Sequence, residues 1–599
     1  MTASHDLDLK PIGNCGVSAL INRGGRYVWA CAPRFDSDPF FSNLLSGTAA
    51  ADEGAQGVWS VEVQDLASVE QEYLRNTPVV RTVLTDARGA AVEVIDFCPR
   101  YRRSGRAYRP TAFVRRLRPL AGAPRISIRL RPTRGWGAQA AERTSGSNHV
   151  RYIGSDVTLR LTTNAPVSHI LSERWFRLEE EVGLFLGPDE PFAGHLLGSV
   201  QAMLAETKSY WREWVRTLSV PLDWQEVVIR AAIALKLCAW EETGAIVAAL
   251  TTSIPEAPDS GRNWDYRYCW IRDAYYVVQA LNRLGAADLL ENYLGYLRNI
   301  VDQSGGGHIQ PVYGVGLEPI LRERTAEALP GYRGMGPVRV GNQAHEHLQH
   351  DVYGQVVLSN VQAFFDQRLL RPATVEDFEA LERVGERAFA MHDQPDAGLW
   401  EFRTIARVHT YSAVMCWAAC DRLGNAAEAL GLSDRAAYWR GKAQAVRERV
   451  EAEAFNTALG RFAGSFGGEE LDASLLQLVD LRFIAPDDPR HVATVGAIER
   501  ELMRGSHLLR YALDDFGAPE TAFNFCTFWY IEALHHAGRA QEARELFSEM
   551  VARRTSAGLL SEDFGLKDGE LWGNYPQTYS LVGLINCAVL LSRPWASVR

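Results

Sequence analysis

The residues of this chain best suited to chemistry lie in one aromatic and charged run, 262–273. Its twelve residues include four aromatic residues, three arginines and two aspartates. Such a run is too polar for a buried strand and too aromatic for an ordinary exposed loop. Flat rings can stack on sugar rings, while guanidinium and carboxylate groups hold sugar hydroxyls. A sugar pocket is therefore one interpretation of the run, and an aromatic loop packed under a domain interface is the other.

Two glutamates in later segments could supply the carboxyl groups that cleave a glycosidic bond, one protonated and one ionised. Glu401 lies between two aromatic residues, and an apolar surrounding suits a general acid. Glu562 lies in the segment 558–564. Asp514 and Asp515 form a rival acidic pair. Spacing along the chain does not rank these candidates, because each alone could be an ordinary loop carboxylate.

Composition bounds the class of protein. The chain has 599 residues, 47% hydrophobic and 23% charged, which predicts a globular protein of two or more domains. Its net charge of −10 argues against nucleic acid as a partner. Nine scattered cysteines without a CxxC pair indicate reduced thiols. Since there is no signal core at the start and no long apolar run, we expect a cytoplasmic protein without a membrane partner.

The first part of the chain has the pattern of β-strands. Runs at 79–85, 91–97, 125–130 and 157–162 are rich in β-branched residues or alternate apolar and polar positions. Turns containing Gly, Pro and Asn separate them, which predicts an antiparallel β-sandwich. A helical stretch that begins near Glu206 then predicts a linker helix between two domains.

Helical periodicity dominates after the linker and predicts twelve helices. They are expected near 225–239, 272–284, 286–302, 348–367, 375–392, 408–423, 432–453, 470–478, 488–503, 520–536, 539–553 and 576–592. A closed ring of six helix pairs is favoured over a stacked solenoid, because no repeat of fixed period is visible. The connections after odd-numbered helices are long, at 303–347, 393–407, 454–469, 504–519 and 554–575. In an alternating ring they share one end with the run 262–273, so we expect the functional site there.

Several segments carry a resemblance to a known family. The run that ends at Asp273 resembles the signature of glycoside hydrolase family 15, which contains glucoamylases, related α-glucosidases and bacterial trehalases. Further segments match in order, at 12–16, 29–37, 331–334, 340–342, 349–354, 398–401, 523–529 and 573–577. The resemblance covers nearly the whole chain. One departure is Asn14 before Cys15, where many relatives have Asp; it lies outside the predicted catalytic part.

The resemblance implies an architecture and a reaction. The architecture is a multidomain α+β protein with an N-terminal antiparallel β-sandwich, a helical linker and a C-terminal (α/α)6 barrel. We assign these domains to 1–205, 206–223 and 224–599. The reaction is inverting hydrolysis at a non-reducing α-glucosyl end. By similarity Glu401 is the general acid and Glu562 the general base.

The resemblance also implies the sugar contacts. Arg272 and Asp273 are similar to the pair that holds the hydroxyls of the terminal glucose. Tyr266 is similar to the tyrosine near the attacking water, and Trp270 to a wall of the pocket. The predicted set is completed by Trp400 and Arg510.

Several alternatives stay open. A glucoamylase-type glucosidase that releases glucose from oligosaccharides is our main hypothesis, and a trehalase that acts on a disaccharide is the alternative. A non-catalytic sugar-binding protein and a phosphorylase are disfavoured by the presence of Glu401 and Glu562. His345 and His347 fail the HExxH pattern of a zinc site, because position 349 is Gln. The sequence therefore predicts neither a metal nor a cofactor.

Overall fold

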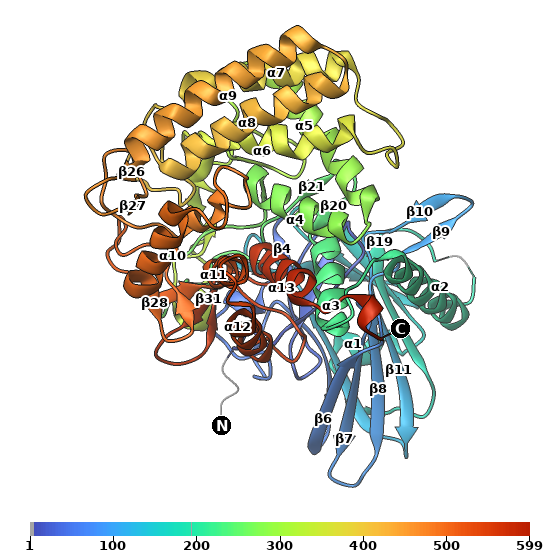
Figure 1. Ribbon diagram of the computed structural model, residues 1–599. Helices are drawn as coiled ribbons and strands as arrows, with labels where there is room; N and C mark the ends of the chain where they lie inside the picture. Colours follow the sequence, from blue (N-terminus) through green and yellow to red (C-terminus); the bar gives the residue numbers. More distant parts are fainter. Residues whose placement is uncertain (1–4, 193, 599) are drawn as a thin grey trace.

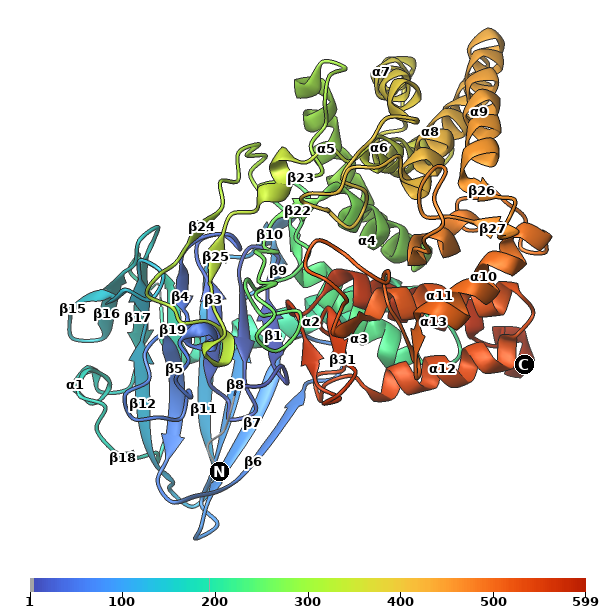
Figure 2. The ribbon, with the colours of Figure 1, turned by 90° about the vertical axis from the view of Figure 1, so that its left-hand side faces the viewer.

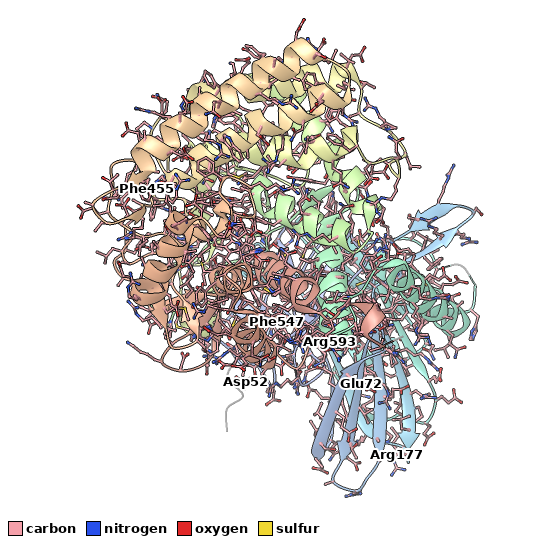
Figure 3. The ribbon with its side chains drawn as sticks, in the orientation of Figure 1. Asp52, Glu72, Arg177, Phe455, Phe547 and Arg593 are labelled. Atoms are coloured by element: carbon pink, nitrogen blue, oxygen red, sulfur yellow. The ribbon has the colours of Figure 1, made fainter. Side chains whose placement is uncertain are left out.

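The structure, a computed structural model, describes residues 5–192 and 194–598. Strands form the N-terminal part and helices the C-terminal part (Figures 1 and 2), and Figure 2 shows the sheets on one side of the helices. Glu72 and Arg177 lie in the sheet part, whereas Phe455 and Phe547 lie among the helices (Figure 3). The predicted change from strand to helix along the chain is confirmed.

Two large antiparallel sheets form most of the N-terminal part. The first contains β1 (Lys10–Gly13), β2 (Ser18–Ile21), β3 (Tyr27–Cys31), β4 (Pro39–Phe41), β5 (Val58–Val63), β12 (Arg125–Arg131) and β18 (Phe176–Arg177). The second contains β6 (Leu66–Tyr73), β7 (Val80–Asp86), β8 (Ala91–Phe97), β11 (Phe113–Ala121), β15 (Glu142–Ser145), β16 (His149–Ile153), β17 (Thr158–Thr163) and β19 (Val182–Pro188). Both sheets contribute to one buried core, where the Tyr27 ring meets Phe113 edge-on at 6.2 Å.

A long helix, α2 (Leu196–Thr217), connects the two parts. The linker helix was predicted to begin near Glu206, but it begins earlier, because Val200 and Leu204 continue its apolar face along the second sheet. Trp211 and Trp214, about two turns further on, are buried in the core of the helical part. One helix face thus packs against both domains.

Within the described residues, eleven of the twelve predicted segments are α-helices. They are α3 (Gln225–Leu237), α4 (Ile271–Arg283), α5 (Ala287–Ser304), α6 (Asp351–Val361), α7 (Val375–Met391), α8 (Thr410–Ala429), α9 (Ser433–Ala454), α10 (Pro489–Leu502), α11 (Asn524–His536), α12 (Ala540–Ala552) and α13 (Thr578–Leu591). The segment predicted at 470–478 is instead a short 3₁₀ helix, η5 (Ala473–Leu478). Asp472 caps it, and Arg482 soon turns the chain at a positive φ of 62°, so there is no room for further α-turns.

The helices form an inner and an outer row. Around the inner row α4 contacts α6, α6 contacts α8, α8 contacts η5, η5 contacts α11, α11 contacts α13, and α13 contacts α4. Inner helices such as α11 and α13 are buried on all sides, as their nearly continuous apolar sequences require. The outer helix α9 buries only one stripe, which includes Trp439, Val446 and Val450. The inner contacts therefore close on themselves.

Hydrogen bonds join the sheet domain to the aromatic run 262–273 and to the segment before it. Arg267 and Asp265 form a fully buried ion pair of 2.7 Å within that run. Arg267 Nη1 also donates to the Ser37 carbonyl of the sheet domain at 2.8 Å. Trp29 Nε1 of β3 donates to the Leu250 carbonyl at 2.8 Å. A charge buried as deeply as that of Arg267 needs its hydrogen-bond partners, so the position of the run depends on the Ser37 carbonyl of the sheet domain.

Candidate active site

A pocket opens at the end of the helical domain where the long connections gather. The space inside it, including the open mouth, is about 880 Å³. All of the sugar-site residues predicted from the sequence line it, namely Tyr266, Trp270, Arg272, Asp273, Trp400, Glu401, Arg510 and Glu562. Residues of the connections 303–347, 393–407, 504–519 and 554–575 contribute to the wall. Among the described lining residues, none comes from 454–469.

Glu401 occupies a strained turn. Its φ is 62°, a left-handed conformation that costs a non-glycine residue free energy and is common at functional sites. Its Oε1 accepts hydrogen bonds from Trp270 Nε1 at 2.6 Å and from Arg272 Nη2 at 3.0 Å. The expected apolar surrounding was wrong, because these two donors, and not ring faces, hold the carboxylate. The side chain keeps 22% of its surface exposed to the pocket.

Glu562 is buried, with 2% of its surface exposed. Its Oε1 accepts a hydrogen bond from the Tyr266 hydroxyl at 2.8 Å, and its Oε2 has no partner among the described residues. Burial, and then the negative charges of Glu256 and Asp563, raise the pKa of Glu562 well above its usual value. Arg510 and the Tyr266 hydroxyl act in the opposite direction. A buried carboxylate oxygen that has no hydrogen-bond partner can accept a proton from a bound water.

The run 262–273 links the two glutamates. Tyr266 binds Glu562 and Trp270 binds Glu401, and the two rings meet edge-on with centroids 5.5 Å apart. A buried loop that is fixed by its own ion pair therefore supplies one donor to each carboxyl group. The first interpretation of this run, a pocket wall, agrees with the geometry; the run also packs at the domain interface, so the second holds in part.

Arg272 and Asp273 begin the inner helix α4. Arg272 donates to the Tyr579 hydroxyl at 2.6 Å, to Gln349 Oε1 at 3.0 Å and to Glu401. Asp273 is 4% exposed, and its Oδ2 has no hydrogen-bond partner among the described residues. Burial raises the pKa of Asp273 to about 7, against the effect of the neighbouring guanidinium. An unpartnered acidic oxygen beside a fixed guanidinium suits a hydroxyl-binding site.

Trp400 and Arg510 stand on other walls of the pocket. Trp400 Nε1 donates to Asp472 Oδ2 at 2.8 Å, and its ring packs against Tyr511 at 6.1 Å. Arg510 Nη2 donates to Glu256 Oε2 at 2.7 Å. Both side chains are thus fixed in place before any ligand binds, which lowers the entropy cost of binding.

The rival pair, Asp514 and Asp515, also lines the pocket but is already engaged. Asp514 accepts from Arg262 Nη2 at 2.9 Å and from the Tyr511 hydroxyl at 2.8 Å. Asp515 accepts from the backbone N–H of Arg403 and from the Thr404 hydroxyl. These contacts fasten one loop to another, so the pair closes the pocket wall.

Some lining residues were not found from the sequence. The most consequential is Glu256, which lies ahead of the aromatic run and pairs with Arg510, 254 positions away. No spacing along the chain signals such a contact. Tyr579 and His347 were missed for the same reason.

Among residues 5–192 and 194–598, no group of three or more His, Cys, Asp or Glu side chains is arranged to hold a metal ion. In the same part of the chain, no helix combines the length and apolarity needed to span a membrane.

Comparisons with known proteins agree with the family resemblance. The family model described as glycosyl hydrolases family 15 matches residues 224–589, and the model described as trehalase-like, N-terminal, matches residues 8–176. A protein of Thermoplasma volcanium named trehalase is 31% identical over 592 residues, which cover 96% of this chain and 92% of that protein. A protein of Mycolicibacterium smegmatis named trehalase is 29% identical over an alignment of 613 residues. The alignment covers 97% of this chain and 90% of that protein.

A solved structure shows the same fold. The crystal structure of a bacterial glucoamylase complexed with acarbose has a TM-score of 0.69 to this chain, and the match covers 98% of this chain and 94% of that one. Its sequence is 14% identical, so the likeness concerns the fold alone. The glucoamylase-like fold, with an N-terminal antiparallel sheet domain and a helical C-terminal part, thus agrees with the sequence prediction. The chain belongs to glycosyl hydrolases family 15 and is a glycosidase.

Proposed function

We propose that this glycosidase hydrolyses α,α-trehalose to two glucose molecules with inversion at one anomeric carbon. The observation that carries the choice of substrate is the similarity to relatives named trehalase along almost the whole chain, 96% in the case of the Thermoplasma volcanium protein. The match of residues 8–176 to the trehalase-like N-terminal model supports the same choice. The glucoamylase-type substrate, our main hypothesis from the sequence, becomes the alternative.

The outer wall of the pocket favours a short substrate. Asp515 accepts hydrogen bonds from the backbone N–H groups of Arg403 and Thr404, two and three residues after Glu401, and so holds the two loops together. The Arg403 guanidinium stacks on the Trp264 ring, 4.3 Å from its centroid, and Phe516 packs on the same ring at 6.1 Å. We propose that these contacts hold a wall beyond the general acid that restricts the leaving group to one glucose and obstructs a longer chain.

In the proposed mechanism, Arg272 and Asp273 hold the hydroxyls of the glucose whose bond is cleaved. These hydroxyls replace the Glu401 oxygen at Arg272 Nη2, which allows Glu401 to carry the proton that it donates to the glycosidic oxygen. Glu562 accepts a proton from the water that attacks the opposite face, with Tyr266 orienting its carboxylate. Inversion requires the two carboxyl groups to be about 6.5–9.5 Å apart, so that the water fits between base and sugar.

The remaining proposed contacts are those of Trp400 and Arg510 with the leaving glucose. We propose that Trp400 stacks on the leaving glucose and that Arg510 donates to its hydroxyls. Neither side chain needs to move, since Asp472 and Glu256 already hold them.

We also propose the finer architecture. The two sheets with their common core support a β-sandwich, and the closed inner row of helices supports an (α/α)6 barrel in which η5 replaces one inner helix. We keep the domains at 1–205, 206–223 and 224–599, with the difference that the connecting helix starts at Leu196. A cytoplasmic location stays a prediction from the nine unpaired cysteines, all buried.

Glucose release from trehalose, maltose, isomaltose and maltotetraose tests the proposed function. We expect kcat/KM for trehalose to exceed that for each of the others by about 100-fold or more, because a site built to bind the hydroxyls of one leaving sugar rejects mismatched ones. A preference for maltotetraose would establish the glucoamylase alternative instead. No release from any of the four would contradict both.

A further inference from the structure

A second buried glutamate, Glu256, lies beside the proposed base. It is 5% exposed and lines the same pocket. Its Oε1 accepts a hydrogen bond from Trp264 Nε1 at 3.0 Å, and its Oε2 accepts one from Arg510 Nη2 at 2.7 Å. Its backbone carbonyl accepts from the Thr521 hydroxyl at 2.9 Å. Both carboxylate oxygens and the backbone are thus fixed, which is more than a surface ion pair would show.

Among the largest contributions to the pKa of Glu562, Arg510 supplies the one that comes from a cation. Among the described residues its ion pairs are with Glu256 at 2.7 Å and with Asp563 at 3.4 Å, and it forms none with Glu562. The nearest carboxylate therefore holds the guanidinium. If Glu256 were neutral, Arg510 would have Asp563 and Glu562 as its remaining acidic neighbours.

The groups that face Glu562 come from each surrounding segment. Tyr266 and Glu256 come from the segment that contains the aromatic run, Arg510 from the loop 504–519, and Asp563 follows Glu562 itself. From the other side, Gly573 lies against its carboxylate without a side chain. Of these, the negative charge of Glu256 is the largest contribution after burial that keeps the pKa of Glu562 high.

We propose that Glu256 is a positioning residue that holds Arg510 away from Glu562, and so preserves both the free Oε2 and the basicity of the residue that activates water. This inference rests on the proposed function, in which Glu562 is the general base. An ion pair between Arg510 and Glu562 would occupy Oε2 and weaken the base. Glu256 prevents that pair by offering Arg510 a closer partner.

The test is the pH profile of kcat/KM for Glu256→Gln, measured on trehalose or on whichever of the four glucosides the wild-type enzyme hydrolyses fastest. Glutamine keeps the shape and the hydrogen bond from Trp264 but removes the charge. We expect the acidic limb to move to lower pH by about one unit, because a like charge is lost and a guanidinium approaches. We also expect kcat on the plateau to fall by about 10-fold or more, because a weaker base accepts the proton less readily.

The matched control is Glu520→Gln. Glu520 pairs with Arg262, a residue of the pocket wall, at 3.4 Å and is half exposed, so the pH profile of Glu520→Gln should stay at the wild-type position. A folded Glu256→Gln enzyme with an unshifted acidic limb, or an equal shift in the control, would overturn the inference. If Glu256→Gln does not fold, Glu256→Asp takes its place, because the shorter side chain withdraws the carboxylate from Arg510. The acidic limb of kcat/KM should then move in the same direction by a smaller amount. An unshifted limb in Glu256→Asp would also overturn the inference.

A further variant separates this inference from the proposed function. Glu562→Gln should abolish turnover. If it retains most of the activity, the assignment of the base is wrong and the proposed mechanism fails. If Glu562→Gln is inactive while Glu256→Gln has the wild-type profile, only the role of Glu256 is rejected.

Discussion

Replacing Tyr266 by Phe removes one defined contact of the proposed base. The Tyr266 hydroxyl donates to Glu562 Oε1 at 2.8 Å and lowers the pKa of Glu562, whereas burial and the neighbouring carboxylates raise it. A hydrogen bond to a charged group contributes about 1.5–3 kcal/mol, and one pKa unit corresponds to about 1.4 kcal/mol. Loss of the bond should therefore raise the pKa of Glu562 by about 1–2 units. The ring stays to pack against Trp270.

The sign of this effect follows from the role of Glu562. A general base acts in its ionised form, so a higher pKa moves the acidic limb of kcat/KM to higher pH. The shift is opposite to that expected for Glu256→Gln. Initial rates of glucose release between pH 3 and 9 measure it. Tyr268→Phe is the matched control, because the Tyr268 hydroxyl contacts the Gly341 N–H and not Glu562. An unmoved limb, or a limb at lower pH, in folded Tyr266→Phe would refute the reasoning.

The remaining predictions concern the acid, the glucose site and the packing around the base. Glu401→Gln should lose about 10²–10⁴-fold in kcat on trehalose but far less on α-glucosyl fluoride, whose leaving group needs little protonation; equal losses on both substrates would contradict its role. Asp273→Asn should lower kcat/KM by about 10²-fold or more. The folded-state pKa of Asp273 is raised to about 7, so ionising Asp273 lowers the stability of the wild-type protein increasingly as pH rises from about 4 to 7. Asp273→Asn should therefore melt at a higher temperature than the wild-type protein at pH 8. A lower melting temperature with normal turnover would indicate a purely structural residue. Gly573→Ala should reduce kcat strongly and destabilise by about 1–3 kcal/mol, since its Cβ would lie 2.5 Å from Glu562 Cβ at a φ of 76°. Gly569→Ala is its control, with a similar φ of 70° but its nearest neighbour 3.9 Å away.

Elements with a periodic sequence were the most predictable. The runs 79–85 and 91–97 are β7 and β8 because their side chains alternate or are buried on both faces. Eleven of the twelve predicted helical segments were located for the same reason. The exception, 470–478, is apolar throughout and so has a buried-helix pattern, but its length is limited by the Asp472 cap and the turn at Arg482. Local geometry of that kind leaves no periodic signal.

The site residues that belong to a sequence motif were predictable. Those that depend on pairing between distant parts of the chain were not. The run 262–273 and the segments around Glu401 and Glu562 identified the pocket, because the long loops of a helical ring converge at one end. The surroundings of Glu401 were misjudged from its sequence neighbours, since its actual partners come from Trp270 and Arg272. Nothing in the sequence around Glu256 indicated its proposed role, because that role depends on the contact with Arg510, which forms only in the folded chain.

The anomeric form of the first glucose released from α,α-trehalose tests the central claim most directly. Inverting cleavage converts the glucose held by Arg272 and Asp273 to the β-anomer, while the leaving glucose keeps its own α-configuration. Proton NMR in the first minutes of reaction, before mutarotation, should therefore show α- and β-glucose in equal amounts. Release of α-glucose alone would mean retention and would contradict the proposed pair of Glu401 and Glu562, and no release at all would contradict the substrate.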